Sequence, residues 1–308
     1  MTRAPNRGTT ALHGKETIMD IKPFVDEIER RNLAVEGIIV FQRGEERARH
    51  RWTPEYPRTM YSISKGFVSI AVGMAIDEGA LRLSDRVTRV LKRPAPDPRW
   101  DSLTLEHLLT MTMGKIKFTR PQSLAEALSY RLIREPGSRF LYDNTCTFLC
   151  SAMLTTVTGQ KLREYLLDRL FRPLGIGDPE WLESADGYNI GASGLTLTTA
   201  QMLLFGCFLL QRGNWEGRQL VSSAWIDAAT RTQVPTRPAQ TQPDWDLGYG
   251  YQFWSCRHGA YRLDGRDGQF LVMFPALDAV VAINSNEKEL EPILWAVWDH
   301  VLPRLKGG

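Results

Sequence analysis

A serine and a lysine one helical turn apart open the most apolar helical stretch of the sequence. Ser62 and Lys65 begin the run SISKGFVSIAVGMAIDEG, which ends at Gly79. Their spacing places both side chains on one face of a helix. A lysine whose pKa is lowered by burial can take the proton of a serine and make it a nucleophile. Free N–H groups at a helix start also favour developing negative charge, so the segment predicts a nucleophile, its base and part of an oxyanion site.

The S-x-x-K pattern is short and can occur by chance, so the surrounding sequence must indicate whether it is catalytic. A second copy, Ser285 to Lys288, stands in a charged stretch and predicts no chemistry. The residues after Ser62 are apolar on nearly all sides of the helix, which predicts burial. A lysine in a buried helix needs a polar reason to be there. The alternative to catalysis is an ion pair between Lys65 and a carboxylate at the rim of the helix.

A second polar group precedes another predicted helix. Tyr142 belongs to the only Y-x-N of the sequence. A tyrosine that faces Lys65 could pass a proton between Ser62 and a leaving group. Asn144 could hold the lysine or orient a substrate amide or carbonyl. The alternatives are aromatic packing for Tyr142 and helix N-capping for Asp143 and Asn144, but the combination with the serine and the lysine favours catalysis.

The elements that must position these groups change in kind along the chain. A helix is predicted over 21–31, and two strands with a turn at Gly44 are predicted over 37–53. Helical segments dominate residues 84–195, and one of them is capped by Thr104 and ends at Gly114. After Leu247, strand patterns return before a closing amphipathic helix.

This order of elements predicts an α+β fold (an α/β sandwich). We expect an antiparallel sheet formed by both chain ends, flanked by helices, with an inserted all-helical lobe. The predicted sheet lobe comprises residues 21–83 plus 196–308, the inserted lobe comprises 84–195, and together they form one domain. Residues 1–20 are predicted to be disordered, and Met19 could be the true start.

Composition excludes several classes of function. The fractions of hydrophobic and charged residues, 43% and 24%, are those of a soluble globular protein, and a net charge of +3 is too small to indicate nucleic acid. The sequence has no run of about 18 apolar residues, so no membrane span is predicted, and no secretion signal is recognised. Cys146 and Cys150 are expected to pack rather than form a disulfide, and no metal-type spacing occurs. We therefore expect a cytoplasmic protein without metal or cofactor.

In order along the chain, Ser62-x-x-Lys65, Tyr142-x-Asn144 and the segment GAYRLDGRDGQFLVMFPALDAVVAINSN resemble the serine β-lactamase-related superfamily. The tyrosine in the second motif is similar to that of class C β-lactamases, D,D-carboxypeptidases and the esterases and amide hydrolases grouped with them. LTLEHLLTMTMG, EPGSRFLYDN, LFRPLGI and ASGLTLTTAQML extend the resemblance over residues 22–303. It implies an α/β sandwich with a helical lobe, an acyl-serine intermediate and no metal.

The resemblance also implies roles for individual residues. Ser62 would be the nucleophile, and Lys65 and Tyr142 would be the general base and acid. Asn144 would position polar groups. The oxyanion hole would consist of the backbone N–H of Ser62 and one N–H of the edge strand near Leu263.

The chain departs from the family in its third motif, K-T-G or H-T-G on the edge strand. Counting back from GQFLVMFP places this motif at 260–262, without lysine or histidine. His258 begins only a loose H-x-G and is more often structural. In lactamases and peptidases the cation helps to bind a substrate carboxylate, so its absence argues against efficient β-lactam hydrolysis and leaves ester or amide hydrolysis open. Arg262 or Arg266 could replace it, although solvated surface arginines are the favoured interpretation. Other candidates for the cleft are Asp264, Gly265, Asp267 and Gln269.

The leading hypothesis is a serine hydrolase that acts through an acyl-serine intermediate on a small ester, amide or peptide. One alternative is a D,D-peptidase or β-lactamase, which would require export. Another is a catalytically silent binding or assembly module of the same fold. The expected partner is a small-molecule substrate rather than nucleic acid or a membrane, and the sequence leaves the oligomeric state open.

Overall fold

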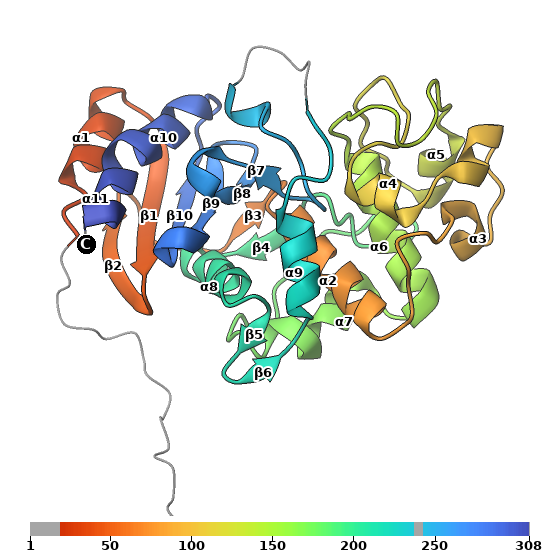
Figure 1. The fold of residues 1–308 in the computed structure, drawn as a ribbon, viewed down its shortest axis with the longest axis horizontal. Coiled ribbons are helices and arrows are strands. Elements are labelled where there is room, and N and C mark those ends of the chain that lie inside the picture. Colours follow the sequence, from red (N-terminus) through yellow and green to blue (C-terminus); the bar gives the residue numbers. More distant parts are fainter. Residues whose placement is uncertain (1–18, 237–242, 308) are drawn as a thin grey trace, which may run out of the picture.

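A six-stranded antiparallel sheet built from both ends of the chain forms one side of the molecule (Figure 1). The structure is a computed structural model that describes residues 19–236 and 243–307. The strand order is β2-β1-β10-β9-β8-β7, and each neighbouring pair is antiparallel. The strands are β1 (Val35–Gln42), β2 (Glu45–Arg51), β7 (Trp254–Ser255), β8 (Tyr261–Gly265), β9 (Gln269–Phe274) and β10 (Ala279–Ser285). The predicted sheet is confirmed.

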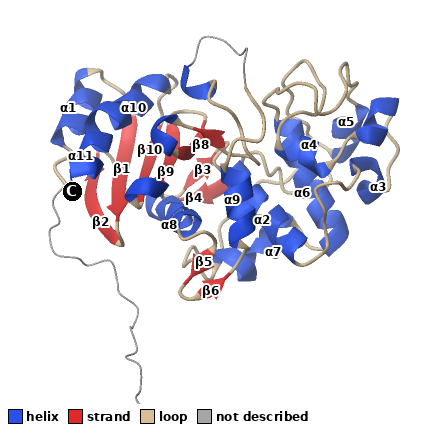
Figure 2. Ribbon diagram, viewed as in Figure 1, coloured by secondary structure: helices blue, strands red, loops and turns tan. Residues whose placement is uncertain are grey.

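Helices cover both faces of this sheet (Figure 2). Alternate residues of β1 belong to different apolar cores because side chains alternate across a strand. Ile38 and Val40 pack with the terminal helices, whereas Ile39 packs on the side of the remaining helices. The terminal helices are α1 (Lys22–Arg30), α10 (Glu291–Ala296) and α11 (Leu302–Gly307), with a π-helical turn at Val297–Val301, and α8 (Thr199–Leu210) lies on the other face.

The remaining helices pack into one apolar core that reaches the sheet. The helix predicted from Thr104 to Gly114 is shorter than expected and ends at Leu109. The division of the chain at residues 84 and 195 stays a prediction, and the predicted disorder of residues 1–20 falls, apart from Met19 and Asp20, outside the described residues. The helices are α2 (Ser64–Asp77), α3 (Val87–Leu91), α4 (Leu105–Leu109), α5 (Leu124–Ser129), α6 (Asn144–Thr158), α7 (Leu162–Leu166), which continues as a π-helical turn at Leu167–Phe171, and α9 (Ser223–Thr230), with 3₁₀ turns at Pro98–Ser102, Pro243–Trp245, Arg257–Gly259 and Pro275–Leu277.

Two short strands that the sequence did not predict lead into and away from the candidate site. β3 (Arg58–Met60) and β4 (Leu195–Leu197) form an antiparallel pair in which Met60 lies opposite Leu195. A three-residue strand after a proline-bearing loop leaves no periodic pattern to recognise. A further pair, β5 (Asn214–Trp215) and β6 (Arg218–Gln219), forms a small hairpin. None of the helices in the described part of the chain has both the length and the hydropathy that crossing a bilayer needs.

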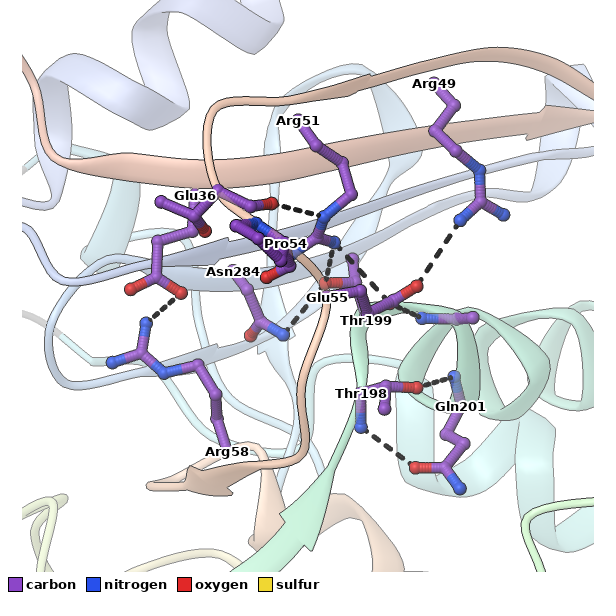
Figure 3. Close-up of polar contacts among 12 residues, drawn as sticks. Glu36, Arg49, Arg51, Pro54, Glu55, Arg58, Thr198, Thr199, Gln201 and Asn284 are labelled. Carbon is purple, nitrogen blue, oxygen red and sulfur yellow. Dashed lines mark hydrogen bonds and ion pairs between the residues drawn. The ribbon is translucent and has the colours of Figure 1, made fainter.

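Polar contacts fix the segment between β2 and β3 (Figure 3). Arg58 of β3 forms an ion pair with Glu36 of β1. Arg51 Nη1 donates a hydrogen bond of 3.2 Å to Thr199 Oγ1, and Asn284 Nδ2 donates one of 3.0 Å to the same hydroxyl. The start of α8 and the chain that enters β3, four residues before Ser62, are therefore held against the sheet.

Helix α2 lies in the centre of the core, and glycines allow its closest contacts. A Cβ atom at Gly66 would lie 2.3 Å from Leu263 Cδ1 of β8. A Cβ atom at Gly73 would lie 2.2 Å from the indole ring of Trp225, whose Nε1 donates to the carbonyl of Ser69. The absence of side chains at these positions therefore sets the distance of α2 from both neighbours.

Gly73→Ala is expected to destabilise the protein. Overpacking against the rigid indole of Trp225 costs about 1–3 kcal/mol, which exceeds the roughly 1 kcal/mol that alanine gains over glycine in a helix. Urea unfolding followed by circular dichroism should show a lower midpoint. Ser69→Ala is the matched control on the same helix, because Ser69 Oγ is buried without a partner among the described residues. Its removal should leave the midpoint unchanged or raise it. A Gly73→Ala variant as stable as the parent would contradict this packing.

Candidate active site

A buried lysine lies at the centre of the candidate site. Lys65 is 1% exposed, and its Nζ lies 2.9 Å from Ser62 Oγ. The same nitrogen donates hydrogen bonds to Asn144 Oδ1 (2.8 Å) and to the carbonyl of Ala192 (3.0 Å). Burial lowers the pKa of Lys65 to about 7. A neutral amine has two hydrogens and one lone pair, so the two oxygen acceptors can take the hydrogens while the lone pair faces the serine hydroxyl. No carboxylate of the described residues forms an ion pair with this lysine.

Tyr142 completes the group around the serine. Its ring lies with its centroid 4.9 Å from Lys65 Nζ, and Tyr142 lines the same cavity as Ser62. The ring stacks on Trp254 at a centroid distance of 5.3 Å. Burial, followed by the nearby charge of Asp264, raises the pKa of Tyr142 far above its usual range. The phenol therefore keeps its proton at neutral pH and is suited to donate it.

The start of α6 positions Tyr142 and Asn144. Asp143 is the N-cap of this helix and accepts a hydrogen bond of 3.0 Å from the backbone N–H of Thr145, so the capping interpretation of Asp143 is confirmed. Lys115, itself buried, lies 2.7 Å from the Asp143 carboxylate. This ion pair fixes the turn between the tyrosine and the asparagine, which lie on either side of the cap.

The pairing of β3 with β4 brings the Ala192 carbonyl to Lys65. The backbone N–H of Gly194 donates a hydrogen bond of 2.9 Å to the carbonyl of Met60. The loop before β4 therefore lies against the segment that carries Ser62. Sequence reasoning missed Ala192 because a backbone carbonyl contributes through its position alone and leaves no signal in the residue type.

Four of the residues described above line a cavity of about 760 Å³, namely Ser62, Tyr142, Asn144 and Ala192. Its wall includes the aromatic rings of Tyr142, Trp245 and Trp254 together with Ser62 and Asn144. Within residues 19–236 and 243–307, no three His, Cys, Asp or Glu side chains gather closely enough to hold a metal ion. All four cysteines are free, and Cys146 and Cys150 are buried as predicted.

Strand β8, predicted to be the edge strand, lies between β9 and the two-residue β7, and it reaches the cavity at a different place from the one predicted. Asp264, Gly265 and Arg266 line the cavity, whereas residues 260–262 do not. The expectation of a solvated Arg262 is wrong. Its side chain is 0% exposed, and its Nε donates a hydrogen bond of 3.1 Å to Asp264 Oδ2. Arg266 is solvated as expected, with a side chain 60% exposed. The residue of β8 that meets the cavity from a buried position is therefore an acid.

Three of the other candidates lie outside the cavity wall. His258 is exposed on the turn before β8 and contacts Trp298 edge-on, at a centroid distance of 6.0 Å. The side chain of Leu263 packs against α2. Asp267 lies in the turn after β8, also outside the wall. The position of His258 argues against a direct role in the site.

Gln269 contributes indirectly to the position of Ser62. Its Oε1 accepts a hydrogen bond of 3.0 Å from the backbone N–H of Tyr61, and its Nε2 donates one of 2.9 Å to the carbonyl of Thr59. The amide side chain thus ties β9 to the residues immediately before the serine. Gln269 does not line the cavity itself.

Two backbone N–H groups at the cavity are candidates for binding an oxyanion. Those of Ser62 and Arg266 find no hydrogen-bond acceptor among the described residues. The guanidinium of Arg266 lies over the ring of Tyr61, 5.4 Å from its centroid, so the two segments are neighbours. Arg266 therefore replaces Leu263 as the second candidate N–H, because β8 meets the cavity at its end rather than at its middle.

Comparisons with known proteins show what this chain is similar to. A family model described as Beta-lactamase matches residues 25–297 of the chain. An uncharacterised protein of Alkalihalophilus pseudofirmus is 24% identical over 257 residues, which are 73% of this chain and 72% of that protein. A β-lactamase of Escherichia coli K12 is 30% identical over 122 residues, or 37% of this chain and 32% of that protein. Among solved structures, a putative 6-aminohexanoate-dimer hydrolase from Bacillus anthracis has a TM-score of 0.76 at 18% identity, covering 90% of this chain and 80% of that one, which shows a common fold.

Proposed function

The chain belongs to the β-lactamase family, and we propose that the protein is a serine hydrolase that forms an acyl-enzyme on Ser62. The observation that carries this proposal is the contact of 2.9 Å between Lys65 Nζ and Ser62 Oγ. Because Asn144 Oδ1 and the Ala192 carbonyl accept the other hydrogen bonds of the amine, its lone pair is directed to the serine.

Acylation uses these groups in sequence. Lys65 takes the hydroxyl proton of Ser62 as Oγ forms a bond to the carbonyl carbon of the substrate. The N–H groups of Ser62 and Arg266 bind the negative oxygen of the tetrahedral intermediate. Tyr142 gives its proton to the leaving alcohol or amine as the bond to carbon breaks, and the Lys65 ammonium returns a proton to the phenolate.

Deacylation repeats the same steps with water. The neutral amine of Lys65 and the phenol of Tyr142 are restored before water attacks the acyl carbon. Lys65 accepts a proton from this water. The bond between the acyl carbon and Ser62 Oγ then breaks, and the serine regains its hydrogen. The products are a carboxylic acid and the unmodified protein.

The substrate class is a small ester or amide. The cavity supports this because β8 presents the carboxylate of Asp264 to it, where binding of a β-lactam or a D,D-peptide by its carboxylate would require a cation. Hydrolysis of p-nitrophenyl pentanoate should show an initial burst of nitrophenol equal to the protein concentration, as expected when an acyl-enzyme accumulates. Nitrocefin should be hydrolysed with a kcat/KM at least about a hundredfold lower, the effect of a lost charged contact. Inertness of folded protein toward the ester would contradict the proposal.

The pH dependence follows from the buried lysine. Because burial lowers the pKa of Lys65 to about 7, the amine is protonated at lower pH and cannot accept the serine proton. We expect kcat/KM for p-nitrophenyl pentanoate to rise about tenfold per pH unit toward pH 7 and then to level off. The raised pKa of Tyr142 keeps the phenol protonated on the plateau. Initial rates between about pH 5 and 9 test this, and a rate that still rises toward the ordinary lysine pKa would contradict it.

A further inference from the structure

The acid near the end of β8 is buried and faces the substrate cavity. Asp264 is 7% exposed and lines the cavity together with Ser62. A buried carboxylate normally requires a compensating partner. Arg262 supplies it from behind, through the hydrogen bond of 3.1 Å from its Nε to Asp264 Oδ2.

Arg262 is held away from the cavity. Its guanidinium lies 4.5 Å from the ring centroid of Trp245 and 5.7 Å from that of Trp254. Its Nη1 also donates a hydrogen bond of 3.0 Å to the carbonyl of Asp244. The arginine is fully buried and does not line the cavity. A ligand beside Asp264 therefore meets the buried acid and not Arg262, and the cation of this wall is Arg266, whose side chain is 60% exposed.

The carboxylate keeps acceptor capacity toward the cavity. An ionised carboxylate offers about four lone-pair sites. Arg262 uses one of its oxygens. The rings of Trp245, Trp254 and Tyr142 line the same cavity, and aromatic faces attract cations in addition to any acceptor.

Asp264 also lies close to the reacting groups. Its partner Arg262 lies 5.7 Å from the ring centroid of Trp254, which stacks on Tyr142. Leu263, the residue before Asp264, packs against α2 at Gly66, next to Lys65. A substrate group beside Asp264 therefore lies close to the bond that Ser62 attacks, rather than at the outer mouth of the cavity.

We propose that Asp264 forms a substrate subsite that selects a hydrogen-bond donor, above all an ammonium group, close to the scissile bond. This inference rests on the proposed function, because Ser62 defines where the scissile bond lies. Donors fit because the carboxylate can only accept. A substrate carboxylate at the same place would meet a like charge, which costs binding energy.

Cations elsewhere in the cavity would favour a substrate carboxylate over an ammonium group. Arg120, Arg134 and Arg139 line it from the loops around α5 and form no ion pair with the described residues. Their side chains belong to exposed residues, where solvent and salt screen charge. Asp264 is buried and held by fixed partners, so its charge acts more strongly on a bound group. The competing outcome of the test is therefore a preference for an anionic substrate, which these arginines would cause.

Matched methyl esters test the subsite. Methyl 5-aminopentanoate, methyl pentanoate and monomethyl glutarate differ mainly in the charge at the distal end, and a pH-stat at pH 7.5 follows their hydrolysis. We expect kcat/KM for the cationic ester to exceed that for the anionic ester by at least about tenfold, the equivalent of roughly 1.4 kcal/mol. Asp264→Asn should lower this ratio by about tenfold or more. Asp278→Asn makes the same charge change on an exposed turn residue outside the cavity and should leave the ratio unchanged.

Binding to an inactive variant separates the subsite from catalysis. Ser62→Ala and the double variant Ser62→Ala, Asp264→Asn are titrated with 5-aminopentanamide, pentanamide and glutaric acid monoamide by NMR. Tighter binding of the cationic amide to Ser62→Ala, lost in the double variant, would support the subsite. If the parent protein hydrolysed no ester, this binding result would still support the subsite, and only the proposed function would have failed. Preference for the glutarate compounds with and without Asp264 would assign specificity to the arginines and overturn the inference. So would a charge preference that Asp264→Asn does not change.

Discussion

Ser62→Ala is expected to abolish hydrolysis, with kcat lowered by about 10³–10⁶-fold, as for other lost serine nucleophiles. The physical reason is that Ser62 Oγ is the only side-chain hydroxyl to which Lys65 Nζ is hydrogen-bonded within the described residues. The variant should also fail to react with a fluorophosphonate probe. Rates with p-nitrophenyl pentanoate and probe labelling on gels measure both effects, and the circular dichroism spectrum checks the fold.

Ser64→Ala is the matched control for this loss. Ser64 lies two residues further on, is fully buried, and donates a hydrogen bond of 2.8 Å to the carbonyl of Met60. Its replacement should cost about 1 kcal/mol of stability while probe labelling persists. Residual catalysis without the nucleophile is expected to be far below a tenth of the parent activity. If Ser62→Ala retained more than about a tenth, the assignment of the nucleophile would be wrong.

Lys65→Met is expected to lower kcat/KM by about 10²–10⁴-fold, the usual contribution of a general base. Methionine keeps the length of the side chain but cannot accept the serine proton. Because burial sets the pKa of Lys65 to about 7, the remaining activity should also lose the rise of rate toward pH 7. A pH–rate profile of the variant with p-nitrophenyl pentanoate measures both effects.

Lys288→Ala tests whether any S-x-x-K lysine would give the same result. Lys288 belongs to the second copy of the pattern and is exposed. Its replacement should leave kcat/KM within about twofold of the parent, as for a surface change remote from the site. A Lys65→Met variant with parental kcat/KM and an unchanged pH profile would show that another group removes the proton.

The sheet and the main site groups could be predicted from the sequence because their signals are local. Ser62 and Lys65 share one helical turn, and Tyr142 and Asn144 flank one helix cap, so each pair needs only one element to be recognised. The family resemblance that these motifs suggested is confirmed by the match over residues 25–297.

The edge-strand motif was misplaced because its position depends on the length of a hairpin. Counting back from β9 assumed a longer connection. In the structure Gly265 pairs directly with Gln269, so the strand ends at the cavity with Asp264 and Gly265. Turn length is set by backbone conformation, including the positive φ of 66° at Asp267, and the hydrophobic pattern of the strands does not encode it.

The burial of Arg262 could not be predicted because distant segments cause it. Alternation along the predicted edge strand favours a solvated polar face, but β8 is not at the edge, because the two-residue β7 pairs with it. Here Trp245, which is remote in sequence, and Trp254 of β7 stack against the guanidinium and cover it. The Ala192 carbonyl was missed for a similar reason, since the pairing of β3 with β4 brings it to Lys65.

The most direct test is peptide mapping by mass spectrometry after an acid quench of the reaction with p-nitrophenyl pentanoate. The amine, the phenol and the hydroxyl that meet in the cavity predict one pentanoyl group per protein, located on Ser62 and absent when the quench follows complete turnover. An acyl group on another residue of the active protein, or hydrolysis without any covalent adduct in the burst phase, would contradict the account.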